Sequence, residues 1–171
     1  TLRRQLERLP AVVPDLVGYL DFLAGLECFV FHGSNRPDIE ELKTDRESGD
    51  SRAFGNQEAV FATPDPHWAA FFAMADRSNA RLLRNGSLAF SRQARTRWYQ
   101  REVVVRDPGA PALTRGWVYV LPRDTFDPEP KFVGLVDTGQ WVSRVPVKPL
   151  FSIGIRPEDY PLSQHVKVVE A

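Results

Sequence analysis

The chain has 171 residues, a length typical of one domain, and its 43% hydrophobic residues suffice for a core of its own. Basic and acidic residues number 22 each, so no net charge directs the chain onto nucleic acid or an anionic membrane. A single cysteine, Cys28, excludes an intramolecular disulfide and a cysteine-ligated metal centre. We expect one cytoplasmic domain over 1–171, with no membrane partner and no metal.

The start of the chain has the periodicity of helices. Leucines at helical spacing predict two short helices within 1–26, the first before Pro10 and the second ending at Gly25.

A strand and a loop are predicted next. The run 28–31 is aromatic and β-branched and is bounded by Gly33, which is typical of a buried strand with His32 at its end. Residues 35–57 include six acids between 38 and 50 and lack periodicity. They are predicted to form an exposed loop. Because this loop directly follows His32, one interpretation is that it covers the site as a lid or helps to recognise the acceptor.

The middle of the chain predicts a second strand followed by a helix. Residues 59–62 form the strand. Asp65 is then a candidate N-cap, with Pro66 at the first helical position. An apolar face follows, and the helix is predicted to end by Asn85–Gly86.

The second half of the chain contains strand patterns and no strong helix pattern. Proline and glycine clusters separate six predicted strands, which are 87–91, 98–106, 116–121, 131–137, 140–145 and 150–155. Helices followed by strands favour an α+β domain with a largely antiparallel sheet over an alternating parallel one.

One segment is rich in arginine. Between Arg77 and Arg106 there are eight arginines and a single acid, Glu102, with Trp98 and Tyr99 among them. Basic and aromatic side chains together can hold phosphates or stack on bases, so weak nucleic-acid contact through this segment is one interpretation. A solvated charged face is the other.

Three short segments share a further pattern. Residues 29–34 end in His-Gly-Ser, residues 59–62 precede a helix with small residues over 69–73, and residues 139–143 begin a strand with Gly-Gln-Trp. In order and spacing they resemble the three motif strands of the ADP-ribosyltransferase superfamily, the fold of poly-ADP-ribose polymerases and diphtheria-type toxins. The resemblance spans about 28–155 and implies a split, largely antiparallel sheet with NAD as substrate.

The resemblance also implies roles for four residues. By motif position, His32 would bond a ribose hydroxyl, the backbone of Gly33 would meet the carboxamide of NAD, and Phe61 would stack on nicotinamide. Gln140 stands where the family has the glutamate that bonds the 2′-hydroxyl of the nicotinamide ribose. His32 and Gln140 are the expected catalytic residues, and His32, Gly33 and Phe61 the expected NAD-binding residues.

Two of these positions depart from the family's usual His-Tyr-Glu. Phe61 keeps the stacking face of a tyrosine. Gln140 keeps a hydrogen-bonding side chain but lacks the negative charge that would stabilise an oxocarbenium-like transition state. Thr138 stands where the arginine-modifying branch has an acid, so an arginine acceptor is not supported.

The favoured function is therefore transfer of a single ADP-ribose from NAD to an unknown acceptor, protein or nucleic acid. Whether the chain is an enzyme stays open, because the first alternative is a catalytically silent NAD or ADP-ribose binding module. The second is an RNA-binding or RNA 2′-phosphotransferase-like protein. Taken singly, His32, Phe61 and Gln140 also fit purely structural roles in strands.

Overall fold

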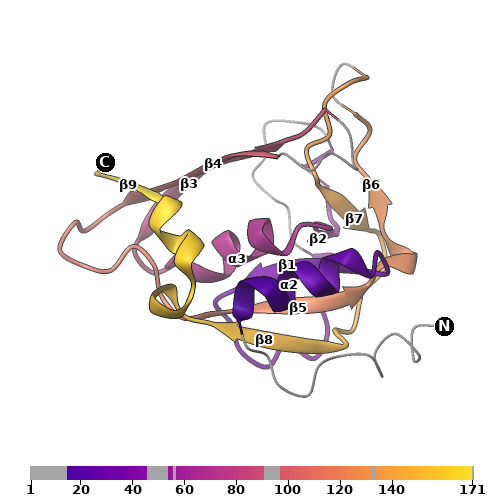
Figure 1. Cartoon of the computed structure of the whole chain (residues 1–171), viewed down its shortest axis with the longest axis horizontal. Coiled ribbons are helices and arrows are strands. Elements are labelled where there is room, and N and C mark those ends of the chain that lie inside the picture. The colour runs from indigo at the N-terminus through magenta and orange to yellow at the C-terminus, as the bar shows by residue number, and fades with distance from the viewer. Residues whose placement is uncertain (1–14, 46–53, 56, 91–96, 132–133, 171) are drawn as a thin grey trace.

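The computed structural model describes residues 15–45, 54–55, 57–90, 97–131 and 134–170, shown in Figure 1. Over these ranges it contains two α-helices and three three-stranded sheets, in which all strand pairs but one are antiparallel. The predicted α+β class is confirmed. The helix expected before Pro10 lies outside the described residues.

The first sheet packs against both helices (Figure 1). Its strands, in spatial order, are β1 (Phe29–Ser34), β5 (Gly116–Pro122) and β8 (Phe151–Ile155). One face buries Phe31 and Val118 against Leu20 and Ala69 of the helices. Two of the predicted strands, 116–121 and 150–155, are confirmed within a residue or two.

Each α-helix begins at the predicted kind of cap. In α2 (Leu16–Gly25), the Asp15 side chain accepts hydrogen bonds from the first turn, and the helix ends at Gly25 as expected. In α3 (Pro66–Met74), the Asp65 carboxylate accepts from two backbone amides of the first turn. Such caps satisfy amide groups that have no partner within the helix.

The predicted length of α3 is wrong. The helix ends at Met74, and the residues expected to continue it form β3 (Ala80–Leu88). The Asp76 carboxylate accepts from the amide and hydroxyl of Ser78, which builds a turn that competes with the helix. Residues 80–88 then pair along their whole length with β4 (Trp98–Val105), so tertiary pairing overrides local helical periodicity.

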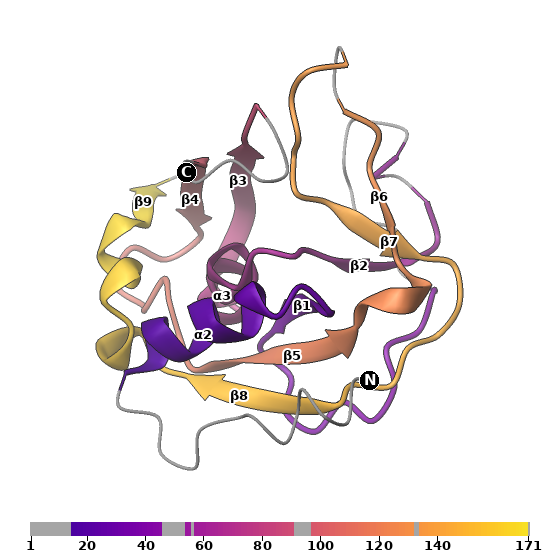
Figure 2. The same cartoon turned by 45° about the vertical axis from the view of Figure 1, so that its right-hand side comes forward.

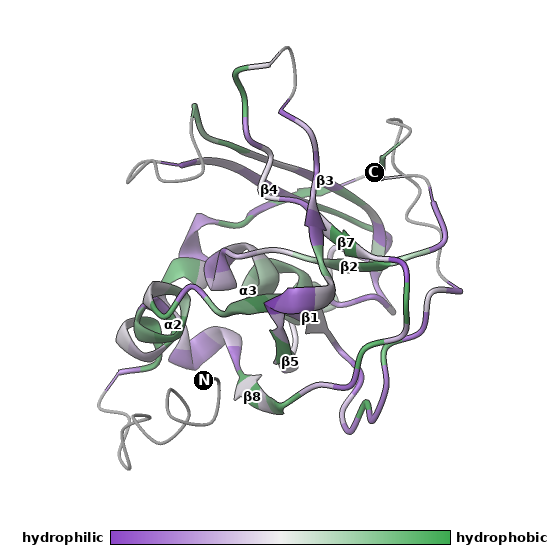
Figure 3. Cartoon of the chain, turned by 90° about the vertical axis from the view of Figure 1, so that its right-hand side faces the viewer, coloured by the Kyte–Doolittle hydropathy of each residue, from purple (hydrophilic) through white to green (hydrophobic). Residues whose placement is uncertain are grey.

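The other two sheets stand on either side of α3 in Figure 2. One has the order β2, β7, β6 and the other the order β3, β4, β9. Their remaining strands are β2 (Val60–Ala62), β7 (Trp141–Ser143), β6 (Asp127–Pro128) and β9 (Lys167–Glu170). In Figure 3, β2 lies beside β7 and has the hydrophobic colour that its three apolar residues require.

One strand prediction is wrong, and one strand of the structure was not predicted. The described part of 131–137 is not a strand: Gly134 donates its amide to the Lys131 carbonyl in a turn, and the pairing with β7 is made earlier by β6. Prolines at 128 and 130 restrict that strand to a sheet edge. The sequence analysis missed β9, which pairs in parallel with β4.

The acidic loop 35–57 is more firmly held than expected, while 46–53 and residue 56 lie outside the description. Leu42 is buried and exchanges two backbone hydrogen bonds with Val147. The Tyr119 hydroxyl donates to the Arg36 carbonyl and accepts from the Ile39 amide. The described part of this segment, 35–45, is therefore anchored to the core, and its role as a lid stays a prediction.

Candidate functional site

The candidate site begins where β1 and β2 separate. Phe31 and Thr63 exchange two backbone hydrogen bonds, of 2.7 and 2.9 Å, in an isolated bridge between the strands. Regular antiparallel pairing would next join Gly33 to Phe61. Instead, Nδ1 of the His32 ring lies 2.8 Å from the Phe61 carbonyl oxygen. In a regular ladder the Gly33 amide would donate to this oxygen. Here the His32 ring contacts it instead, and the two strands share a single bridge.

This contact fixes the proton on the His32 ring. A carbonyl oxygen only accepts hydrogen bonds, so Nδ1 must donate. In the neutral ring Nε2 is then an acceptor, which is the role expected of a histidine that receives a ribose hydroxyl. The structure brings His32 to the backbone of Phe61, and the Phe61 side chain is half-buried.

Gly33 presents its backbone at the same place. Alternate residues of an antiparallel strand direct their N–H and C=O groups to the same edge, so those of Gly33 point toward β2, as those of Phe31 do. On the face of β1 that packs against α3, a Cβ added to Gly33 would overlap the Ala69 carbonyl oxygen and lie 2.6 Å from the Ala73 amide nitrogen. The glycine is thus required by helix packing and leaves its polar groups at the edge where the strands separate.

Gln140 lies one position before β7. The register of β2 with β7 pairs Ala62 with Trp141, and its continuation sets Gln140 opposite Thr63. The Gln140 side-chain oxygen Oε1 is buried and has no hydrogen-bond partner among the described residues. A buried acceptor without a donor costs about 1–3 kcal/mol, which a ligand hydroxyl would offset. This atom therefore fits a group that donates a hydroxyl proton.

These registers bring the predicted site residues to one region. His32 is adjacent to the Phe31–Thr63 bridge, and Phe61 is two residues from it. Gln140, one position before β7, lies opposite Thr63 when the register is continued.

The turn before Gln140 is held by a buried ion pair. Arg97 Nη2 lies 2.6 Å from the Asp137 carboxylate, and the two side chains are only 12% and 3% exposed. Arg97 also donates to the Ser87 hydroxyl, while the other Asp137 oxygen accepts from the Gly139 amide. Gly139 has φ +72°, a left-handed conformation that favours glycine, and a Cβ added there would lie 2.8 Å from Arg97 Nη1. The sequence analysis counted Arg97 only as part of a basic stretch.

Glu129 is a second residue that the sequence analysis missed. It is only 8% exposed, its amide donates to the Gln140 carbonyl oxygen at 2.8 Å, and its carboxylate accepts from the Thr138 hydroxyl. The one local signal is its place between two prolines, which predicts an edge strand. Nothing in the sequence indicates that it faces a residue eleven positions away.

No family model, curated protein or solved structure matches the chain.

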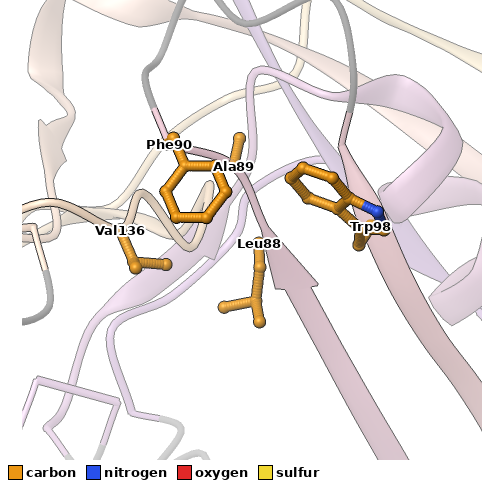
Figure 4. A pocket seen from close by; sticks show the side chains of 5 residues that line it. All are labelled: Leu88, Ala89, Phe90, Trp98 and Val136. Atoms are coloured by element: carbon orange, nitrogen blue, oxygen red, sulfur yellow. The ribbon is translucent and has the colours of Figure 1, made fainter.

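An apolar hollow lies near the turn that precedes Gln140. It has a volume of about 270 Å³ and is lined by Leu88, Ala89, Phe90, Trp98 and Val136, as Figure 4 shows. The rings of Phe90 and Trp98 meet edge to face at 5.6 Å, and both are more than half exposed. Because its lining side chains are apolar, except for the indole N–H of Trp98, this hollow suits an apolar group.

Several arginines of the basic stretch already have partners within the chain. Arg84 lies 2.9 Å from Glu102, and Arg97 is the partner of Asp137. Arg101 stacks on the Tyr99 ring, 3.9 Å from its centre. Nucleic-acid contact through this stretch stays a prediction.

Other kinds of site have little support in the described residues. Neither α-helix has the length and apolar character to cross a membrane. In the same part of the chain, no three His, Cys, Asp or Glu side chains are grouped as a metal ion would require. Burial raises the pKa of the Cys28 thiol, which makes it a poorer nucleophile at neutral pH.

Proposed function

We propose that the chain has an ADP-ribosyltransferase-like split sheet, binds NAD where β1, β2 and β7 meet, and transfers a single ADP-ribose to an acceptor. The observation that carries this proposal is the contact of the His32 ring of β1 with β2, where Nδ1 lies 2.8 Å from the Phe61 carbonyl oxygen. This contact lies beside the Gly33 backbone, and leaves Nε2 as an acceptor in the neutral ring.

The groups at this point match the nicotinamide end of NAD. The N–H and C=O of Gly33 complement a carboxamide, which carries one acceptor and one donor group. Phe61 offers an aromatic face for the pyridine ring. His32 Nε2 and Gln140 Oε1 are two acceptors for ribose hydroxyls, and the second of them is buried without a donor from the described chain.

The reaction itself is a substitution at ribose C1′. The bond from C1′ to the nicotinamide nitrogen breaks, its electron pair goes to that nitrogen, and neutral nicotinamide leaves. Positive charge develops on the ribose ring. An acceptor atom then bonds to C1′ and releases its proton to solvent. Groups that hold the ribose and stabilise this charge accelerate the step.

A second candidate function is a silent NAD or ADP-ribose binding module. It is favoured by one observation, the uncharged amide of Gln140 at the position where a carboxylate would stabilise the developing charge. The two functions share the binding site and differ only in nicotinamide release.

Removal of the Phe61 ring should weaken NAD binding. If the ring stacks on nicotinamide, Phe61→Ala is expected to reduce the binding free energy by about 1–3 kcal/mol, the usual value of one aromatic platform. The hydrogen bond to His32 uses the Phe61 backbone and survives the substitution. Calorimetric titration with NAD measures the effect.

Phe22→Ala is the matched control, because Phe22 is a half-exposed phenylalanine on α2. It should leave the affinity for NAD unchanged. Equal losses in the two variants would mean that the effect comes from general destabilisation, and would count against stacking by Phe61.

Nicotinamide release separates the candidate functions. We expect the protein to bind NAD and to release nicotinamide in the presence of an acceptor or water. Binding without release identifies the silent module. No NAD binding at millimolar concentration, together with RNA affinity that falls steeply with salt, would replace both with the nucleic-acid alternative.

A further inference from the structure

Glu129 is the cross-strand neighbour of Gln140. The register of β6 with β7 pairs Pro128 with Trp141, and its next position sets Glu129 opposite Gln140. The 2.8 Å hydrogen bond from the Glu129 amide to the Gln140 carbonyl confirms this pairing. Side chains of directly opposed residues lie on the same face of a sheet, with Cβ atoms about 4.5–5.5 Å apart. The side-chain carboxylate of Glu129 and the side-chain amide of Gln140 therefore lie on the same face of this sheet.

Thr138 holds the Glu129 carboxylate on this face. Its hydroxyl donates to Glu129 Oε2 and also accepts from the Gln140 amide nitrogen, at 3.4 Å. Glu129 is only 8% exposed, and a charge in such surroundings acts on its neighbours more strongly than a charge in water. The Glu129 carboxylate is thus held beside Gln140, the uncharged residue at the position of the family's glutamate.

We propose that Glu129 supplies the negative charge that Gln140 cannot, so that the two residues divide the work of a single catalytic glutamate. Gln140 binds the ribose hydroxyl, and Glu129 stabilises the positive charge that develops on the ribose ring as nicotinamide leaves. This inference rests on the proposed function. It predicts an active transferase despite the glutamine.

The test is Glu129→Gln, which removes the charge and keeps the size of the side chain. We expect kcat for nicotinamide release to fall about 100-fold, the usual effect of losing one electrostatic group aimed at a transition state, while the dissociation constant for NAD changes less than about threefold. A merely structural role would lower stability and leave kcat of the folded protein unchanged. Asp127→Asn is the matched control, an exposed acid on the same strand, and should leave kcat unchanged.

A variant that moves the negative charge from position 129 to position 140 shows whether the loss of kcat is electrostatic. The double variant Glu129→Gln with Gln140→Glu keeps one carboxylate and one amide on the same ladder position, and we expect it to recover most of the lost kcat. If Glu129→Gln does not fold, Thr138→Val removes only the hydroxyl that holds the carboxylate, and should lower kcat about tenfold.

The outcomes separate this inference from the proposed function. A protein that binds NAD and releases nicotinamide equally fast with and without the Glu129 charge overturns the inference and leaves the function standing. Binding of NAD by the parent without any release also overturns it and identifies the silent module. Absence of NAD binding by the parent overturns the proposed function, and the inference with it.

Discussion

Arg97→Met is expected to lower the free energy of unfolding by about 3–5 kcal/mol, the usual cost of removing one member of a buried ion pair. The Asp137 side chain is 3% exposed, and its carboxylate lies 2.6 Å from the guanidinium. Methionine matches the length of the arginine stem but supplies no donors for Asp137 or Ser87. Denaturant unfolding measures the change.

The same substitution should also affect the candidate site. Asp137 accepts from the Gly139 amide, and Gly139 directly precedes Gln140. Loss of the ion pair frees this turn, so NAD affinity of the folded Arg97→Met protein should fall.

Arg84→Met is the control for Arg97→Met. Arg84 is 54% exposed, and its partner Glu102 also lies 3.5 Å from Lys167. Because the arginine side chain is largely in water and Glu102 keeps Lys167 as a partner, this variant should lose less stability than Arg97→Met. Similar losses in the two variants would contradict the buried role assigned to Arg97.

Gly33→Ala is expected to destabilise the protein by about 3 kcal/mol, at the upper end of overpacking effects. The new methyl group would overlap the Ala69 carbonyl oxygen and lie 2.6 Å from the Ala73 amide nitrogen. Both are backbone atoms of α3, so the helix must move away from β1. Thermal unfolding should show a lower midpoint, and NAD binding should weaken because β1 carries His32.

Gly25→Ala is the matched control for Gly33→Ala. An added Cβ at Gly25 meets no heavy atom within 4 Å. Alanine at such a position usually leaves stability unchanged or raises it by up to about 1 kcal/mol. Equal destabilisation by the two alanines would show that close packing is not the reason for glycine at 33.

Local sequence signals predicted the elements whose causes are local. Neighbours within a few residues account for the Asp65 cap with Pro66, the end of α2 at Gly25 and the start of β1. The strand β1 continues to Ser34, past the end predicted at His32. The end of α3 and the strand that follows it depend on pairing with β4, about twenty residues further on. The apolar face of the predicted helix could not show that pairing.

The candidate site shows the same division. Motif order indicated His32, Phe61 and Gln140, and strand registers bring them to the Phe31–Thr63 bridge. Glu129 could not be predicted, because it meets Gln140 only through cross-strand pairing. An irregular turn separates the two residues in the sequence.

A crystal of the protein soaked with NAD at millimolar concentration tests the central claim most directly. We predict density for the nicotinamide ribose beside His32 Nε2 and Gln140 Oε1, with the carboxamide on the Gly33 backbone and the pyridine ring against Phe61. Ordered NAD bound elsewhere, or an unchanged site at saturating NAD in a lattice that leaves His32 accessible, would contradict the proposal.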